Sequence, residues 1–408
     1  MHWLQPEGDG RITLNALRLG VIGFVAILGE GSVLANAQVL TLTTWIFLPC
    51  LFPAPHAFMR PARPTLLAPV PGFVTGIFSG NHRNNVNYIG NIVCDANDLL
   101  PHSVRAVEIK RTSNQPIRLK TLAPLSIVLF LGSSLSILLL GLSIWREDGM
   151  SILATIFLSC LSSLIGLANK WTLRLPKRMI KQGEIPRGDV VVRYPKGSFL
   201  IVRCDEIVAR ELYFAPETIE YLVQHDAAYR ILSLVGTMLL MSGVIALANA
   251  QIELQIAWAG SYMLIGSSYW ILAALPGKVH WDTSCYTVSS ECLSDSNMTK
   301  KGYPSENSTF TQALWKAIVV IKNTDWVGRS DACPDTPAWS DWLSAARACS
   351  KDAREAEEKV KGVKTWAVPA WNAQSYLAEV LDKQAKMDVK NMGEGEDEVD
   401  DRTACSLR

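Results

Sequence analysis

Charged residues are missing from long stretches of this 408-residue chain. Four runs of 21 to 25 residues contain no Asp, Glu, Lys or Arg: 121–145, 149–169, 231–252 and 254–277. A helix rises about 1.5 Å per residue, so each run is long enough to cross a hydrocarbon core about 30 Å thick. This patterning excludes a single water-soluble globular domain and predicts an α-helical membrane protein.

The chain also lacks an excess of charge of either sign. It has 39 Lys and Arg against 38 Asp and Glu, a formal net charge of +1. This balance excludes a nucleic-acid-binding protein that relies on overall basicity. We expect membrane lipids and, through the polar segments, other proteins as partners, and no nucleic acid.

Signatures of common enzymes and metal sites are absent from the sequence. It has no G-x-S-x-G, no phosphate-binding G-x-x-x-x-G-K-[ST] and no H-E-x-x-H motif. The nine cysteines and six histidines are scattered and form no C-x-x-C pair. We therefore expect no cofactor and no metal site, and a disulfide between Cys285 and Cys292 only if the tail is lumenal.

A fifth apolar region, residues 14–52, is best interpreted as two short spans broken near Gly29, Glu30 and Gly31. This gives about six transmembrane helices in three hairpins, within segments 1–52, 121–170 and 231–277. The alternative is a cleaved signal peptide, because Ala35-Asn36-Ala37 has the form of a cleavage site. The length of the region favours the hairpin.

The cations predict the orientation of the spans. Segment 53–120 carries eight Lys and Arg and segment 171–230 carries ten, whereas the three hairpin tips hold only Arg146. Because Lys and Arg are enriched in cytoplasmic loops, we expect a multi-pass protein with both termini and both long loops in the cytosol. The sequence does not decide between the plasma membrane and an internal membrane.

The two long loops differ in character. Residues 53–120 form a Pro- and Asn-rich loop, in which the run 72–80 (GFVTGIFSG) suggests a loop or interfacial element. Residues 171–230 predict a small α+β module. Its hairpin joins 189–194 to 198–204 through Pro195-Lys196-Gly197, and short helices are expected at 206–214 and 216–223.

The tail, residues 278–408, is polar and holds seven of the thirteen tryptophans. Apolar spacing predicts three amphipathic helices, near 314–321, 339–346 and 373–381. The charged run 351–364 predicts a solvated helical face, and residues 394–401 predict an acidic, disordered end.

Candidate functional residues are few. Ionisable or polar groups inside a membrane are expensive and often functional, which selects Glu30, Asn36 and Asn249. Asn297 and Asn307 begin N-glycosylation sequons that work only on the lumenal side. His82 and the cluster from Asp205 to Glu211 are candidates for acid–base chemistry, with ion pairing on a solvated helix as the simpler interpretation. No catalytic residue is identified.

Three parts of the chain carry a resemblance: residues 188–223 (GDVVVRYPKGSFLIVRCDEIVARELYFAPETIEYLV), the first apolar region with its GEG and LANAQ sequences, and the tail sequences ALWKAIVVIKNTDWV and PAWSDWL. Together they resemble uncharacterised polytopic membrane proteins of filamentous fungi. The resemblance implies a membrane protein sometimes encoded beside genes of specialised metabolism, and it supplies no catalytic residues.

Three functions are compatible with these features. We expect an accessory or scaffold protein, because the polar parts are elaborate and the membrane part is nearly uncharged. The alternatives are a small-molecule transporter or channel that uses Glu30, Asn36 and Asn249, and a membrane-embedded enzyme that acts on a lipophilic intermediate.

Overall fold

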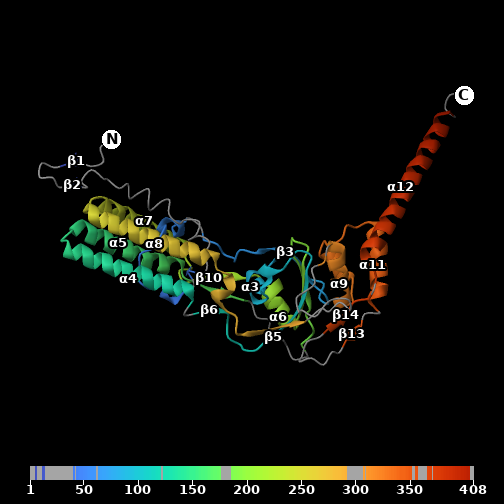
Figure 1. Cartoon of the computed structure of the whole chain (residues 1–408), viewed down its shortest axis with the longest axis horizontal. Coiled ribbons are helices and arrows are strands. Elements are labelled where there is room, and N and C mark those ends of the chain that lie inside the picture. Colours follow the sequence, from blue (N-terminus) through green and yellow to red (C-terminus); the bar gives the residue numbers. More distant parts are fainter. Residues whose placement is uncertain are drawn as a thin grey trace. The chain divides into compact units, whose positions relative to one another are not determined.

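The structure, a computed structural model, describes residues 5–6, 12–13, 40–41, 43–60, 63–120, 123–175, 185–291, 307, 309–351, 354–356, 365–369 and 371–404. The chain divides into two compact units, which are described separately (Figure 1). The helix unit comprises residues 1–67, 115–174 and 217–283, and the sheet unit comprises 68–114, 175–216 and 284–408. A two-stranded ladder of β1 (Gln5–Pro6) and β2 (Ile12–Thr13) lies near the start of the chain.

The described part of the helix unit contains four long helices. They are α4 (Pro124–Trp145), α5 (Gly149–Asn169), α7 (Asp226–Ala248) and α8 (Ile252–Ala274). All four coincide with the uncharged runs of the sequence. By length and composition, α4, α5 and α7 are the described helices that are apolar enough to cross a membrane. These three helices are compatible with a membrane protein, and the predicted number of six spans is not confirmed.

Short strands follow or precede these helices. β6 (Arg118–Leu119) pairs with β11 (Trp281–Asp282), and β7 (Trp171–Arg174) pairs with β10 (Thr218–Tyr221). A 3₁₀ turn, η5 (Gly277–Val279), precedes β11. The helix predicted at 216–223 is wrong, because Ile219 and Tyr221, residues that favour strands, pair with β7 instead.

The return arm of the predicted first hairpin is not a spanning helix. From Thr43 to Phe52 its only regular element is a short 3₁₀ turn, η1 (Thr44–Phe47), and a second turn, η2 (Pro55–Phe58), follows. Pro49, Pro53 and Pro55 prevent a continuous helix here, since proline lacks the backbone donor and clashes with the preceding turn. The outward arm, residues 14–39, lies outside the described residues.

The sheet unit is built on a six-stranded sheet whose order is β12-β5-β9-β8-β3-β4. The strands are β12 (Tyr286–Glu291), β5 (Val104–Arg111), β9 (Phe199–Arg203), β8 (Val190–Arg193), β3 (Val70–Gly76) and β4 (His82–Val86). The β5–β9 pair is parallel and the other pairs are antiparallel. The predicted 195–197 hairpin is confirmed as the connection between β8 and β9.

The α+β module is not confined to residues 171–230 as predicted, because only two of its six strands come from that range. Residues 72–80 form part of β3 and its turn rather than a loop or interfacial element. β-branched Val70, Val74 and Thr75 favour the strand, and Gly72 absorbs an irregularity in the pairing between Pro71 and Val74.

Helices of the tail cover one part of the sheet. α9 (Phe310–Ile321), α10 (Asp325–Arg329) and α11 (Pro337–Ser350) join Val104, Phe199 and Ile201 in one core, to which α12 (Ala373–Ala404) contributes Ala373 and Leu377. The three amphipathic helices predicted for the tail are confirmed.

Two other predictions for the tail are wrong. Within the charged run, β13 (Arg354–Ala356) pairs with β14 (Thr365–Ala367) in place of a helix. The backbone of α12 continues through the acidic end to Ala404, where we predicted disorder. The Ala, Leu, Glu and Lys residues that begin α12 are strong helix formers, which favours this extension.

Short elements complete the sheet unit. They are α3 (Tyr88–Val93), η3 (Ala96–Asp98), α6 (Glu206–Ala209) and the π-helical turn η4 (Arg210–Phe214). The predicted helix at 206–214 is confirmed as α6 continued by η4.

Candidate functional site

A groove of about 660 Å³ opens on the sheet unit. The turn between β8 and β9 lies on one side of it, and its other walls come from the start of β3, from β4, from the loop before β5 and from the start of α9. The lining residues are Pro71, Gly72, Phe73, Asn84, His102, Arg193, Tyr194, Pro195, Lys196, Gly197 and Phe310. Its volume is within the range of small-molecule sites, about 300–1,000 Å³.

The groove gathers sequence features that are far apart in the chain. Gly72 and Phe73 belong to the run 72–80, and Asn84 belongs to a later part of the Pro- and Asn-rich loop. Residues 195–197 form the predicted hairpin turn. Each feature is visible in the sequence by itself. That the three segments lie together at one groove could not be predicted, because nothing in the sequence specifies that β3 pairs with β8.

Two glycines allow the close approach of the groove walls. A Cβ atom at Gly72 would lie 2.9 Å from the carbonyl oxygen of Arg193, and one at Gly197 would lie 2.8 Å from Nδ1 of His102. Gly197 also has a φ of +72°, a conformation that favours glycine. The turn is fixed to the loop before β5, since the His102 amide donates to the Lys196 carbonyl over 3.2 Å.

Cationic and neutral groups line the groove, and none of its lining residues in the described part of the chain is acidic. The Arg193 guanidinium lies over the Phe73 ring, 4.4 Å from its centroid. Burial lowers the pKa of Arg193, and the charge of Asp331, which is not a lining residue, opposes that shift. A half-buried guanidinium gains most from an anion placed beside it.

Polar atoms in the groove are unevenly satisfied. The Tyr194 hydroxyl donates to Oδ1 of Asn91 over 2.9 Å, and burial raises the pKa of that hydroxyl. Nδ1 of His102, in contrast, is buried without a hydrogen-bond partner among the described residues. Phe310 packs on Phe199 with ring centroids 5.5 Å apart, which gives the groove a fixed aromatic wall.

Of the residues predicted as intramembrane candidates, Asn249 is described, whereas Glu30 and Asn36 lie outside the described residues. Asn249 is exposed at the end of α7, where its side chain donates to the Ile245 carbonyl over 2.7 Å. It is the C-cap residue of that helix.

Of the two sequon asparagines, Asn307 is among the described residues and Asn297 lies outside them. Asn307 is buried, and its amide nitrogen donates to the His102 carbonyl over 2.7 Å. The atom that would carry a glycan is thus engaged in holding the loop beside the groove.

The candidate acid–base residues differ in their surroundings. His82 is exposed on β4. Glu206 is buried and accepts from Nε of Arg210 over 2.9 Å, and buried Glu211 pairs with Nη1 of Arg111. Glu206 and Glu211 are thus engaged in ion pairs, as in the simpler interpretation. They differ from it in being buried, because that interpretation placed the pairs on a solvated helix.

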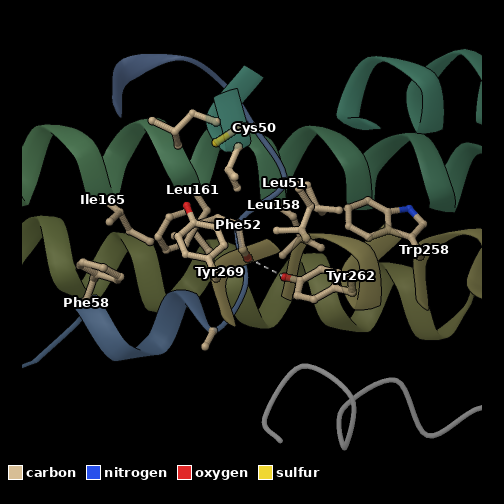
Figure 2. Close-up of a cluster of buried hydrophobic side chains, with 14 of the residues drawn as sticks. Cys50, Leu51, Phe52, Phe58, Leu158, Leu161, Ile165, Trp258, Tyr262 and Tyr269 are labelled. Carbon is tan, nitrogen blue, oxygen red and sulfur yellow. Dashed lines mark hydrogen bonds between the residues drawn. The ribbon is translucent and has the colours of Figure 1, made fainter. Parts of the chain in front are cut away.

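The interior of the helix unit is filled by the irregular segment 43–60. Figure 2 shows Cys50, Leu51 and Phe52 among side chains of α5 and α8, where the Tyr262 hydroxyl donates to the Phe52 carbonyl over 3.0 Å. The Leu51 amide donates to the Gly132 carbonyl over 3.0 Å. Protein groups thus satisfy backbone polar atoms of this irregular segment.

The tips of the two helix hairpins lie together. Asp148 accepts from the amides of Met150 and Ser151 at the start of α5, and its other oxygen accepts from the Gln251 amide over 2.7 Å. Arg146 and Glu253 form an exposed ion pair at 3.4 Å. The two hairpins therefore run in the same direction.

Among the described residues, no group of three or more His, Cys, Asp or Glu side chains is placed to hold a metal ion. Comparison with protein-family models, with curated proteins and with solved structures gives no match to this chain.

Proposed function

We propose that this chain is a multi-pass membrane protein with an accessory or scaffold role. The helix unit is its anchor, and the sheet unit is the part that engages other molecules. The observation that carries the anchor is the large number of apolar side chains that the long helices leave exposed.

Many large apolar side chains on these helices are exposed, although others pack in the core, and the buried polar side chains are mostly small and hydroxyl-bearing. Ile127, Ile137 and Ile231 are each more than 60% exposed, whereas Ser136 and Thr155 are buried. Gly243 allows α7 to approach α5 closely, because a Cβ there would lie 2.8 Å from Leu158. Such a surface is unfavourable in water and stable in lipid, where helices associate through small residues.

Strand pairing supports an even number of crossings between the polar segments. β5 precedes α4, β9 lies between α5 and α7, and β12 follows α8, yet β5 pairs with both β9 and β12. Segments that share a sheet must lie on the same side of a membrane. If α7 crosses, α8 must therefore cross back, although it is less apolar than the other three helices.

We assign the sheet unit to the cytosolic side. Its segments, with those that flank the helices, carry most of the Lys and Arg of the loops, and the joined hairpin tips contain only Arg146. This follows the preference of cations for the cytosolic face.

The alternatives have less support from the described residues. A transport path would need a polar or open route through the bundle, but side chains of segment 43–60 occupy its interior. A membrane-embedded enzyme would need available reactive groups, but Glu206 and Glu211 are engaged in ion pairs.

Site-directed labelling tests the topology. In a cysteine-free background, Glu147→Cys at a tip and Lys196→Cys at the groove are treated with an impermeant maleimide in sealed vesicles. We expect the two positions to be labelled from opposite sides, with the protein retained in the membrane after alkaline extraction. Labelling from the same side, or release by alkali, contradicts the proposal.

Metabolite profiling of a deletion strain tests the accessory role, with cells and medium extracted separately. Loss of a later product, restored by the full chain but not by the helix unit alone, supports a scaffold that acts through the sheet unit. Unchanged compounds redistributed between cells and medium would instead indicate transport.

A further inference from the structure

We propose that the groove beside the β8–β9 turn binds an organic anion: a carboxylate attached to an apolar, ring-containing body. This inference goes beyond the accessory role and concerns a small molecule rather than a protein partner. It rests on the chemistry of the groove alone.

The charge of the lining residues selects an anion. Arg193 ends β8, Lys196 lies in the turn that follows, and no carboxylate of the described residues lines the groove. Lys196 is exposed and Arg193 half-buried, so one cation can attract the ligand and the other can hold it in a partly desolvated position. Charge-assisted hydrogen bonds from such groups are about twice as strong as neutral ones.

The apolar lining selects the rest of the ligand. Phe73, Phe310 and the prolines at 71 and 195 present rings to the groove. Phe73 is held beneath Arg193 and Phe310 against Phe199, so both walls are preorganised. A flat ring can pack between them while its carboxylate reaches the cations.

Two further polar side chains, Asn84 and His102, line the groove. Asn84 is exposed and can bond to the ligand, whereas Nδ1 of His102 is buried without a partner among the described residues. Bare phosphate would use the cations but leave the aromatic walls uncovered, so the groove fits an aryl or cyclic carboxylate better.

The test is equilibrium dialysis of the full-length, detergent-solubilised protein against sodium 2-naphthoate, with protein-free micelles as the blank. We expect saturable uptake of one naphthoate per chain. The neutral analogue 2-naphthalenemethanol should bind about tenfold more weakly or worse, since it lacks the charge. Inorganic phosphate should compete poorly.

Two variants locate the site. Lys196→Gln, at an exposed position on the turn, should weaken naphthoate binding by roughly three- to tenfold, and Arg193→Gln by about tenfold or more. Lys351→Gln, an equally exposed lysine of the sheet unit outside the groove, is the matched control and should bind as the unaltered protein does.

The proposal is overturned by the absence of saturable uptake, by equal binding of the neutral alcohol, or by equal effects of Lys196→Gln and Lys351→Gln. Equal competition by inorganic phosphate would also overturn it, because the ring would then contribute nothing. None of these results depends on membrane topology, which the labelling experiment measures separately.

Discussion

The buried pair of Arg111 and Glu211 illustrates how single residues connect distant segments. Arg111 ends β5, Glu211 lies in η4, and the two side chains are 15% and 4% exposed. The Arg111 guanidinium also lies 5.7 Å from the centroid of the Tyr286 ring on β12. One side chain thus joins three segments of the sheet unit.

Removing one partner of this pair should be more damaging than removing both. Arg111→Met leaves the Glu211 carboxylate buried and unpaired, and we expect a loss of about 3–5 kcal/mol of unfolding free energy. The double variant Arg111→Met/Glu211→Leu should recover a large part of that loss. Denaturant unfolding followed by tryptophan fluorescence measures both.

The exposed pair of Lys110 and Glu108 is the control. Lys110→Ala should leave the unfolding midpoint unchanged, because solvent screens an exposed pair. A double variant less stable than Arg111→Met would refute the explanation by an unpaired buried charge.

His280 should make the stability of the helix unit depend on pH. It is buried after α8, and burial lowers its pKa, as does the charge of Lys120. The unfolded chain, whose histidine titrates near pH 6.5, then binds protons more readily than the folded chain. The contribution of His280 to the free energy of unfolding is therefore fully present above about pH 6.5 and decreases as the pH is lowered from 7 to 5.

Thermal unfolding in detergent at a series of pH values measures this dependence. His280→Gln should reduce the loss of stability between pH 7 and 5, whereas His225→Gln, at an exposed position, should retain it. Identical pH profiles for His280→Gln and the unaltered protein would count against the assignment.

At the scale of elements, glycines determine how closely segments pack in the helix unit. A Cβ atom at Gly166 of α5 would lie 2.5 Å from the carbonyl oxygen of Ile46, whereas Gly141 of α4 has no neighbour within 4 Å of that position. The two positions form a matched pair, because both are interior to long helices.

Alanine should therefore have opposite effects at these positions. Gly166→Ala forces η1 away from α5, and we expect a loss of about 1–3 kcal/mol. Gly141→Ala should be neutral or stabilise by up to about 1 kcal/mol, since glycine is a poor helix former. Unfolding in mixed micelles compares them, and a loss at Gly141 equal to that at Gly166 would contradict the packing argument.

Asp148 determines how the two helix hairpins meet. Asp148→Ala removes the N-cap of α5 and the acceptor for the Gln251 amide, so we expect a loss of about 1–2 kcal/mol in the same assay. Glu147→Gln, an exposed neighbour that also loses its charge, should have little effect. Equal losses of unfolding free energy for Asp148→Ala and Glu147→Gln would show that the charge at the hairpin tip, and not the N-cap, stabilises the unit.

At the scale of the whole molecule, the sequence predicted what depends on local periodicity. The uncharged runs predicted the four long helices, and the apolar spacing around Leu314 and Trp342 predicted α9 and α11. Local signals failed at Ile219, where pairing with β7 prevails over a helical pattern. They also failed at Gly72, whose strand neighbours cannot be deduced from its own segment.

The groove was predictable only in its parts. The turn at Lys196 was expected, but its neighbours Phe73, His102 and Phe310 arrive from three segments through strand pairing. The arrangement of the sheet, and not any short motif, creates the site.

The distribution of the sheet over three segments predicts which truncations are tolerated. A chain ending at Thr283 lacks β12 and α9–α12, which leaves Ile77, Phe199 and Ile201 uncovered. We expect it to aggregate after solubilisation and to be cleaved rapidly by protease. Size-exclusion chromatography and limited proteolysis measure this.

A chain ending at Val389 is the control, because it retains Leu377 and the Gln384 side chain that accepts from the Ala338 amide. It should behave as the full chain does. Protease resistance of the 283-residue chain equal to that of the full chain would show that the sheet is stable without its last strand.

The long separation between β5 and β12 also has a consequence for synthesis. Thr112 and Thr287, whose hydroxyls are 2.7 Å apart, are separated by 175 positions in the chain. At about 5–20 residues per second, a ribosome needs roughly 9–35 s to make that stretch. For that time one edge of β5 is open to pairing with a neighbouring nascent chain. The four charged residues of the strand, Arg105, Glu108, Lys110 and Arg111, oppose such pairing until its own partner emerges.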